Sequence, residues 1–137
     1  MASAPPAARP RPISPHLTHW RWGIHMVVSI LHRVTGHALA LGAVPLFCWW
    51  LVALASGERA YGSFYRTLSG WFGYMLAIGF TWVTLQHMAN GVRHLVMDSG
   101  AGFEIGTNKR SATSTLVFSL VVTLGLWGAI AMSRGGI

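Results

Sequence analysis

Residues 34–57 read VTGHALALGAVPLFCWWLVALASG, an uninterrupted run without a charged side chain. Two further charge-free runs cover residues 67–92 and 111–133. At about 1.5 Å of rise per helical residue, each run is longer than the roughly 30 Å hydrocarbon core of a bilayer. The sequence therefore predicts an all-α integral membrane protein with three transmembrane helices.

Charged residues are scarce over the whole chain. Ten Lys or Arg and three Asp or Glu among 137 residues make 9% charged, against roughly 25% in soluble domains. The basic residues stand at the ends of the charge-free runs instead of clustering on one solvated surface, which excludes a nucleic-acid-binding protein. Cys48 is the single cysteine and lies inside the first run, so a disulfide framework and a thiolate metal site are excluded.

The N-terminal part differs in composition from the rest of the chain. Five of the six prolines lie within residues 1–15, where their fixed φ angles and missing N–H groups oppose helix formation. We expect residues 1–20 to form an extended Pro-rich cytoplasmic arm and residues 21–137 to form a three-helix membrane anchor domain. The expected spans are about 28–55, 67–95 and 111–133. Because the long segment 1–33 precedes the first run, we expect that run to be retained and not cleaved as a signal peptide.

The distribution of basic residues predicts the orientation. Before the first span and between the second and third lie seven of them: Arg9, Arg11, Arg21, Arg33, Arg93, Lys109 and Arg110. The opposite side has three: Arg59, Arg66 and Arg134. By the positive-inside rule the N-terminus is cytoplasmic and the C-terminus lies outside. We expect a multi-pass protein of the bacterial cytoplasmic membrane, with the mitochondrial inner membrane as the second assignment.

One face of the first span carries polar groups. His25, Ser29, His32 and Gly36 follow the i, i+4, i+7, i+11 spacing of one helix face, and Arg33 borders that face. A hydroxyl and a guanidinium one turn apart can bind the carbonyl oxygen of a small polar-headed ligand or an anionic group. The alternative is that Arg33 extends to lipid phosphates while the serine bonds its own backbone.

The second span ends in an unusual stretch, residues 86–98, QHMANGVRHLVMD. His87 and His94 lie two helical turns apart and project from nearly the same face, with Gly91 between them leaving room for a flat cofactor. A neutral imidazole is a good axial ligand for haem iron, and Arg93 with His94 could hold the haem propionates. The alternatives are that His87 makes a hydrogen-bonded contact with another helix and that His94 is simply solvated at the membrane edge. His32 and His37 of the first span are candidates for a second axial ligand, but Arg33 places them near the cytoplasmic end, so we expect that ligand to come from another subunit.

Three segments together resemble the cytochrome b membrane-anchor subunits of succinate dehydrogenase. They are RPISPHL at 11–17, SILHRVTG at 29–36, and the pattern H-x-x-x-G-x-R-H-L-x-x-D at 87–98. The order and spacing of the segments relative to the three expected spans agree with that family. At residues 18–21 the chain reads THWR, which departs from the aliphatic residue and Tyr that usually precede the arginine. This departure bears on the details of the contact that the resemblance implies with the iron–sulfur subunit.

The resemblance implies a function and a set of site residues. It implies a non-catalytic anchor within a heteromeric helix bundle, with partners that are a second, smaller anchor subunit, an iron–sulfur subunit and a flavoprotein subunit. It implies that ubiquinone is reduced at a site lined by Ser29 and Arg33. His87 is then an axial ligand of haem b shared with the smaller anchor, and His32, Arg93 and His94 lie near the haem propionates. A fumarate reductase anchor and a structural three-span protein without redox function remain alternatives.

Overall fold

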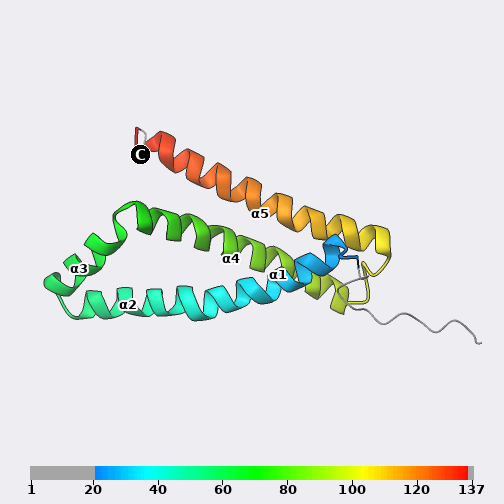
Figure 1. Cartoon of the computed structure of the whole chain (residues 1–137), viewed down its shortest axis with the longest axis horizontal. Coiled ribbons are helices and arrows are strands. Elements are labelled where there is room, and N and C mark those ends of the chain that lie inside the picture. The colour runs from blue at the N-terminus through cyan, green and yellow to red at the C-terminus, as the bar shows by residue number, and fades with distance from the viewer. Residues whose placement is uncertain (1–20, 136–137) are drawn as a thin grey trace, which may run out of the picture.

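The computed structural model describes residues 21–135, and within them the chain is helical without a strand. The elements are α1 (Ile24–Ala38), the π-helical turn η1 (Leu39–Ala43), α2 (Val44–Ala55), α3 (Glu58–Leu68), α4 (Trp71–Asp98) and α5 (Ile105–Ser133). The start of α1, the end of α4 and the start of α5 lie at one end of the molecule, and α3 and the end of α5 lie at the other (Figure 1). The expected arm, residues 1–20, lies outside the described residues.

The first span is one continuous rod of 32 residues, Ile24–Ala55, composed of α1, η1 and α2. It begins one helical turn before the expected boundary at residue 28. The π-helical turn Leu39–Ala43 directly precedes Val44 and Pro45. Because proline lacks an N–H and its ring crowds the preceding turn, a locally widened turn accommodates it without ending the helix. The rod ends before Gly57, whose φ of 93° is in the left-handed region that glycine tolerates.

The second span differs from the expectation for residues 67–95. Thr67 belongs to α3, a separate helix, and α4 begins at Trp71 and continues to Asp98. The axes of α3 and α4 meet at 79°. By length and composition, two helices, Ile24–Ala55 and Ile105–Ser133, could each cross a membrane, and the described chain has three spans if α3 and α4 together count as one. The third helix begins at residue 105 instead of 111, because its polar first turns need no lipid contact to be helical.

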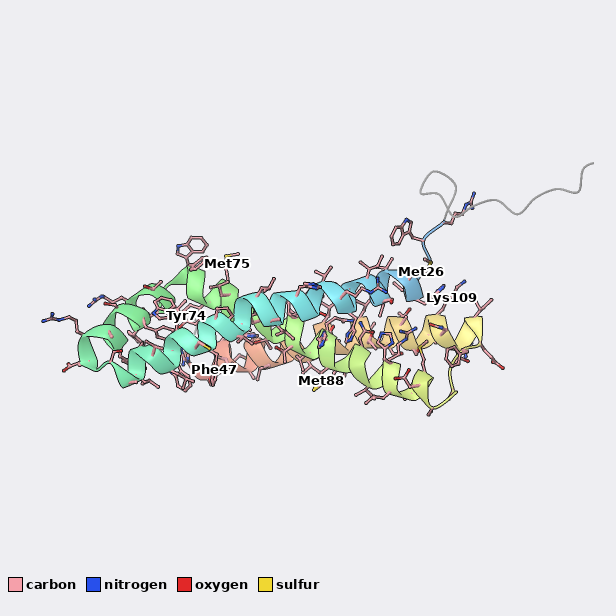
Figure 2. All side chains as sticks on the ribbon, turned by 90° about the horizontal axis from the view of Figure 1, so that it is seen from below. Met26, Phe47, Tyr74, Met75, Met88 and Lys109 are labelled. Carbon is pink, nitrogen blue, oxygen red and sulfur yellow. The ribbon has the colours of Figure 1, made fainter. Side chains whose placement is uncertain are left out.

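The interior of this bundle is polar and its surface is apolar. Apart from Val28, Ala53 and Ala112, the buried side chains among the described residues are polar or charged: Thr35, Gln86, Asn90, Arg93, Thr115, Ser119 and Thr123. Large apolar side chains such as Met75 and Met88 are instead 63% and 53% exposed and point away from the ribbon (Figure 2). This arrangement fits a protein surrounded by lipid, where apolar side chains gain nothing by turning inward and polar ones must find partners.

The buried polar side chains of α4 and α5 are joined by hydrogen bonds. Ser119 donates to Gln86 Oε1 at 2.6 Å, and Gln86 Nε2 donates to Thr115 at 3.5 Å. Asn90 Nδ2 donates to the carbonyl of Val28 at 3.1 Å, which joins α1 to the same network. The α1 helix therefore packs against both α4 and α5, whereas α2 contacts neither of these helices in the described part of the chain.

Replacing Gln86 with leucine is expected to destabilise the helix bundle. The change keeps the side-chain volume but removes the two hydrogen bonds by which Gln86 joins α4 to Thr115 and Ser119 of α5. Interhelical hydrogen bonds in membranes contribute about 0.6 kcal/mol each, so we expect a loss of about 1 kcal/mol. The thermal midpoint of helix loss in detergent measures it, with Thr84→Ala on the exposed side of α4 as the control. Equal midpoints for the two variants would contradict a stabilising role of the network.

Candidate functional site

Three histidines from two helices form a cluster. His32 of α1 and His87 of α4 stack with their ring centroids 4.0 Å apart and an interplanar angle of 8°. His94, two turns further along α4, places its ring centroid 5.0 Å from that of His32 with an interplanar angle of 48°. The structure therefore brings together three of the predicted site residues, and the site lies where α1 crosses α4.

The hydrogen bonds around His87 determine which ring nitrogen is free. The hydroxyl of Thr35 donates to the carbonyl oxygen of His32 at 3.0 Å. His87 Nδ1 lies 3.2 Å from that carbonyl oxygen and 3.1 Å from Thr35 Oγ1. A carbonyl can only accept, so Nδ1 carries the proton and donates to both oxygens. The other nitrogen, Nε2, then has a free lone pair and makes no hydrogen bond within residues 21–135.

Two glycines lie against this cluster at different distances. A Cβ atom at Gly36 would stand 3.1 Å from His87 Cε1, closer than most real contacts of that kind. A Cβ atom at Gly91 would meet His32 Cε1 at 4.0 Å, an ordinary van der Waals distance. Gly36 therefore sets the close approach of α1 to the His87 ring, and Gly91 faces His32.

The residues of this cluster are suited to bind a haem iron, with an imidazole as the ligand. A histidine that donates Nδ1–H to a backbone carbonyl and presents Nε2 is the usual arrangement of an imidazole metal ligand, because the hydrogen bond fixes the tautomer and the ring orientation. Beside it, Nδ1 of His32 is buried and has no hydrogen-bond partner. A buried polar atom without a partner is costly unless a group absent from the protein chain bonds it. Both observations agree with a bound group at this place.

Arg93 takes partners that the sequence did not predict. The side chain is 7% exposed, its Nε donates to Ser111 at 3.2 Å, and its Nη2 donates to Asn108. Both partners lie near the start of α5, so these contacts tie the end of α4 to the next helix. Contact of Arg93 with haem propionates stays a prediction, and so does the same role for His32 and His94.

Ser29 and Arg33 lie one turn apart on α1. Ser29 is half-buried and Arg33 is exposed. The carbonyl of Arg33 accepts a hydrogen bond from His37 Nδ1 at 2.8 Å. Within residues 21–135, neither the serine hydroxyl nor the guanidinium group forms a hydrogen bond, so both remain available to a ligand. His25, on the same face, has a buried Nδ1 that is also without a partner.

Sequence reasoning missed several residues of this site. Thr35 and Gly36 act across the α1–α4 contact, which the order of residues along one helix does not reveal. The α5 residues that bond to side chains of α4 were missed as well. In the sequence, nothing distinguishes a hydroxyl that faces another helix from one that faces lipid. Their spacing was a usable signal: Ala112, Thr115, Ser119 and Thr123 recur at intervals of three and four and mark the packed face of α5.

Comparison with known proteins decides the family. The family described as succinate dehydrogenase/fumarate reductase transmembrane subunit matches residues 7–126. This chain belongs to that family. The chain is 36% identical over 114 residues to the succinate dehydrogenase cytochrome b556 subunit of Paracoccus denitrificans, covering 83% of this chain and 87% of the relative. The corresponding Rickettsia felis protein is 36% identical over 117 residues, covering 85% and 90%. The mitochondrial cytochrome b560 subunit of Sus scrofa is 33% identical over 118 residues, covering 85% and 69%.

These relationships confirm two expectations from the sequence. The resemblance to cytochrome b anchor subunits of succinate dehydrogenase is confirmed, because the matching relatives carry that name in bacteria and in mitochondria. The all-α membrane fold is confirmed as well, since the family is one of transmembrane subunits and the described residues are helical. The chain is thus a membrane protein whose relatives belong to succinate dehydrogenase complexes.

Proposed function

We propose that this chain is the membrane-anchoring haem b subunit of a succinate dehydrogenase and that His87 Nε2 is an axial ligand of the haem iron. The observation that carries the proposal is the pair of hydrogen bonds that hold His87 Nδ1, since they leave Nε2 free as a ligand. The haem, when bound, supplies a one-electron carrier. The chain supplies the position of the ring, and His32, His94 and Arg93 supply donors for the propionates.

The second axial ligand comes from a second, smaller anchor subunit. The rings of His32 and His87 are stacked nearly parallel and 4.0 Å apart, so the two side chains would not both hold one haem iron. His94 is no better placed, because it lies two turns away from His87 on the same helix. Because α2 contacts neither α4 nor α5, additional helices of a heteromeric bundle can pack against it.

The quinone site uses Ser29 and Arg33. The hydroxyl of Ser29 donates to a carbonyl oxygen of ubiquinone, and the guanidinium group of Arg33 stabilises negative charge as the quinone is reduced. The unfilled hydrogen-bonding capacity of both groups supports this assignment. The electrons come from succinate through the flavoprotein and iron–sulfur subunits, as the family resemblance implies. Protons come from water or a partner, since Asp98, Glu104 and Glu58, the acids of this chain, are on other elements.

The site end of the bundle faces the cytoplasm. The start of α1, the end of α4 and the start of α5 lie together (Figure 1). Arg21 precedes α1 and Arg33 lies on it, Arg93 lies in the last turns of α4, and Lys109 and Arg110 lie in the first turns of α5. The other end carries three basic residues, Arg59, Arg66 and Arg134. The positive-inside rule then directs the first end to the cytoplasm of a bacterium, or to the matrix if the membrane is mitochondrial. Succinate oxidation is the favoured direction because the compared relatives are named succinate dehydrogenase subunits, while the family itself includes fumarate reductase.

A mild detergent purification tests the proposed function. The chain should co-purify with a flavoprotein and an iron–sulfur protein, the complex should reduce ubiquinone with succinate, and its dithionite-reduced spectrum should show one b-type haem per complex. A purified chain that carries no haem absorbance and no flavoprotein would instead support a structural membrane protein.

Removing the hydroxyl of Thr35 tests how His87 is held. Thr35→Val deletes one of two acceptors for Nδ1–H, and loss of such supporting bonds weakens metal binding by about 10- to 100-fold. With the His32 carbonyl still present, we expect the rate of haem loss to an apo-globin acceptor to rise about tenfold. Thr35→Ser keeps the hydroxyl and should restore the slow rate. If serine and valine at this position lose haem equally fast, the hydrogen bond does not support the ligand.

A further inference from the structure

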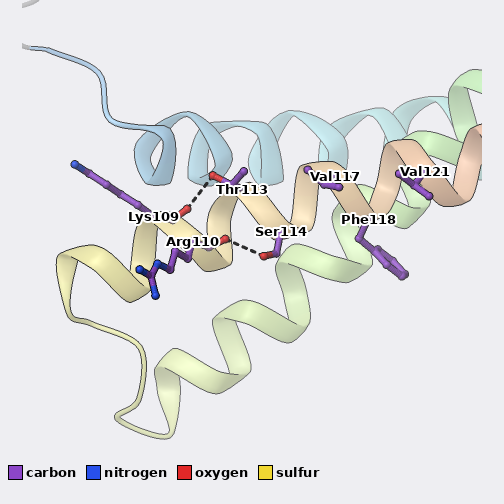
Figure 3. Close-up of a pocket in the computed structure, with 7 residues that line it drawn as sticks. All are labelled: Lys109, Arg110, Thr113, Ser114, Val117, Phe118 and Val121. Atoms are coloured by element: carbon purple, nitrogen blue, oxygen red, sulfur yellow. Dashed lines mark hydrogen bonds between the residues drawn. The ribbon is translucent and has the colours of Figure 1, made fainter.

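The outer face of α5 has a shallow, open groove that neither the haem site nor the quinone site uses. The groove has a volume of about 750 Å³. Figure 3 shows its lining along one helix: Lys109, Arg110, Thr113, Ser114, Val117, Phe118 and Val121. The basic side chains stand at one end and the apolar side chains at the other. We propose that this groove binds an anionic diacyl phospholipid of the surrounding membrane, with the phosphate on Lys109 and Arg110.

The charges at the groove favour an anionic headgroup. Lys109 and Arg110 are exposed, and neither side chain makes a hydrogen bond or an ion pair within residues 21–135. The hydroxyls of Thr113 and Ser114 already donate to the carbonyls of Lys109 and Arg110, at 3.0 and 2.9 Å (Figure 3). The two cations are therefore the free donors of the groove. None of the acidic residues of the chain lines it.

The length of the groove matches one leaflet of a bilayer. From Lys109 to Val121 the helix rises about 18 Å, and half of the hydrocarbon core measures about 15 Å. With the cations at headgroup depth, the apolar part of the groove then runs to about the middle of the membrane. Val117, Phe118 and Val121 are 54%, 47% and 62% exposed and offer an apolar wall over this distance.

A second hollow next to the groove provides a place for the second acyl chain. It has a volume of about 360 Å³, lies between α4 and α5, and shares Ser114 and Phe118 with the groove. Met88, Ala89 and Val92 of α4 form its other wall. The two hollows therefore meet at Ser114 and Phe118. A lipid with two chains can place one chain in each, with the headgroup above both.

The residue types on α5 favour a lipid over a protein helix at this face. Helices in membranes pack through small residues that allow close approach of their backbones. On α5 the small buried residues Ala112, Thr115, Ser119 and Thr123 already face the rest of the bundle. The groove has bulky valine and phenylalanine side chains instead. A flexible acyl chain fills the space between such side chains better than a rigid helix does.

The experiment uses the purified, delipidated complex and native mass spectrometry. Phosphatidylglycerol is titrated against wild type, Lys109→Gln/Arg110→Gln and the control Arg59→Gln/Arg66→Gln, which removes two basic residues at the other end of the bundle. Each basic residue near an anionic lipid contributes about fivefold in affinity, so the first double variant should bind about 30-fold more weakly and the control should match wild type. Phosphatidylcholine should bind wild type more weakly than phosphatidylglycerol.

A groove-filling variant provides an independent readout. Val117→Trp keeps both cations and should abolish tight binding of phosphatidylglycerol because the acyl chain is displaced. Equal affinity of wild type for the two lipids would overturn the proposal. So would unchanged phosphatidylglycerol affinity in both the double variant and Val117→Trp. Loss of a protein subunit from Val117→Trp, with the amount of bound lipid unchanged, would assign the face to a protein partner and would also overturn it.

Discussion

The complex carrying Arg33→Leu is expected to lose about 100-fold in succinate-dependent ubiquinone reduction, while succinate oxidation with a soluble dye as acceptor stays at the wild-type level. Removing a charged donor that stabilises developing negative charge costs about 10²- to 10³-fold in rate, and the exposed position of Arg33 favours the lower end of that range. Ser29→Ala removes a neutral donor and should cost about tenfold. Steady-state rates at several ubiquinone concentrations measure both effects.

Matched variants separate a quinone effect from a general effect of charge. Arg33→Lys keeps the charge but loses the planar fork of donors, so it should fall between wild type and leucine. Arg59→Leu removes an exposed arginine at the opposite end of the bundle and should leave ubiquinone reduction unchanged. If Arg33→Leu reduces ubiquinone with wild-type rate and apparent affinity, the quinone site lies elsewhere.

Replacing His87 with alanine is expected to remove haem b from the complex almost completely. The variant deletes the ring nitrogen of the histidine cluster that the structure leaves free as a ligand, since His87 Nδ1–H is held by two oxygens. Haem per flavin, measured by pyridine haemochrome, should fall to a small fraction of the wild-type ratio. His94→Ala, which changes a neighbouring ring on the same helix, should retain most of the haem. Equal haem content in the two variants would contradict the assignment of His87.

The three long apolar helical segments could be predicted from the charges. Charged side chains are so costly in lipid that the long charge-free runs 34–57, 67–92 and 111–133 mark the spans. The boundaries could not be predicted as well, because helices continue into the polar flanks, as α5 does through Lys109 and Arg110. The α3 helix was missed for a related reason. Its charged residues show only that the segment leaves the lipid, and they do not reveal the 79° bend to α4.

The candidate site could be predicted only in part. Spacing along one helix placed His87 and His94 on one face, and Ser29 with Arg33 one turn apart. The contacts between helices, such as that of Thr35 with His87, depend on how α1 and α5 pack against α4. No periodicity within a single helix determines that packing. Gly36 is an example, since its importance lies in the 3.1 Å that would separate a Cβ atom at this position from the His87 ring of another helix.

The most direct test of the central claim, that His87 Nε2 binds the haem iron, is the reduced-minus-oxidised spectrum of the purified complex carrying His87→Gly, recorded before and after addition of imidazole. The smaller residue leaves a cavity where the ring stood, and free imidazole can take its place at the iron. We predict that the low-spin b-type band is absent from the variant and returns when imidazole and haem are supplied. A low-spin band of wild-type shape and intensity before imidazole is added would contradict the claim.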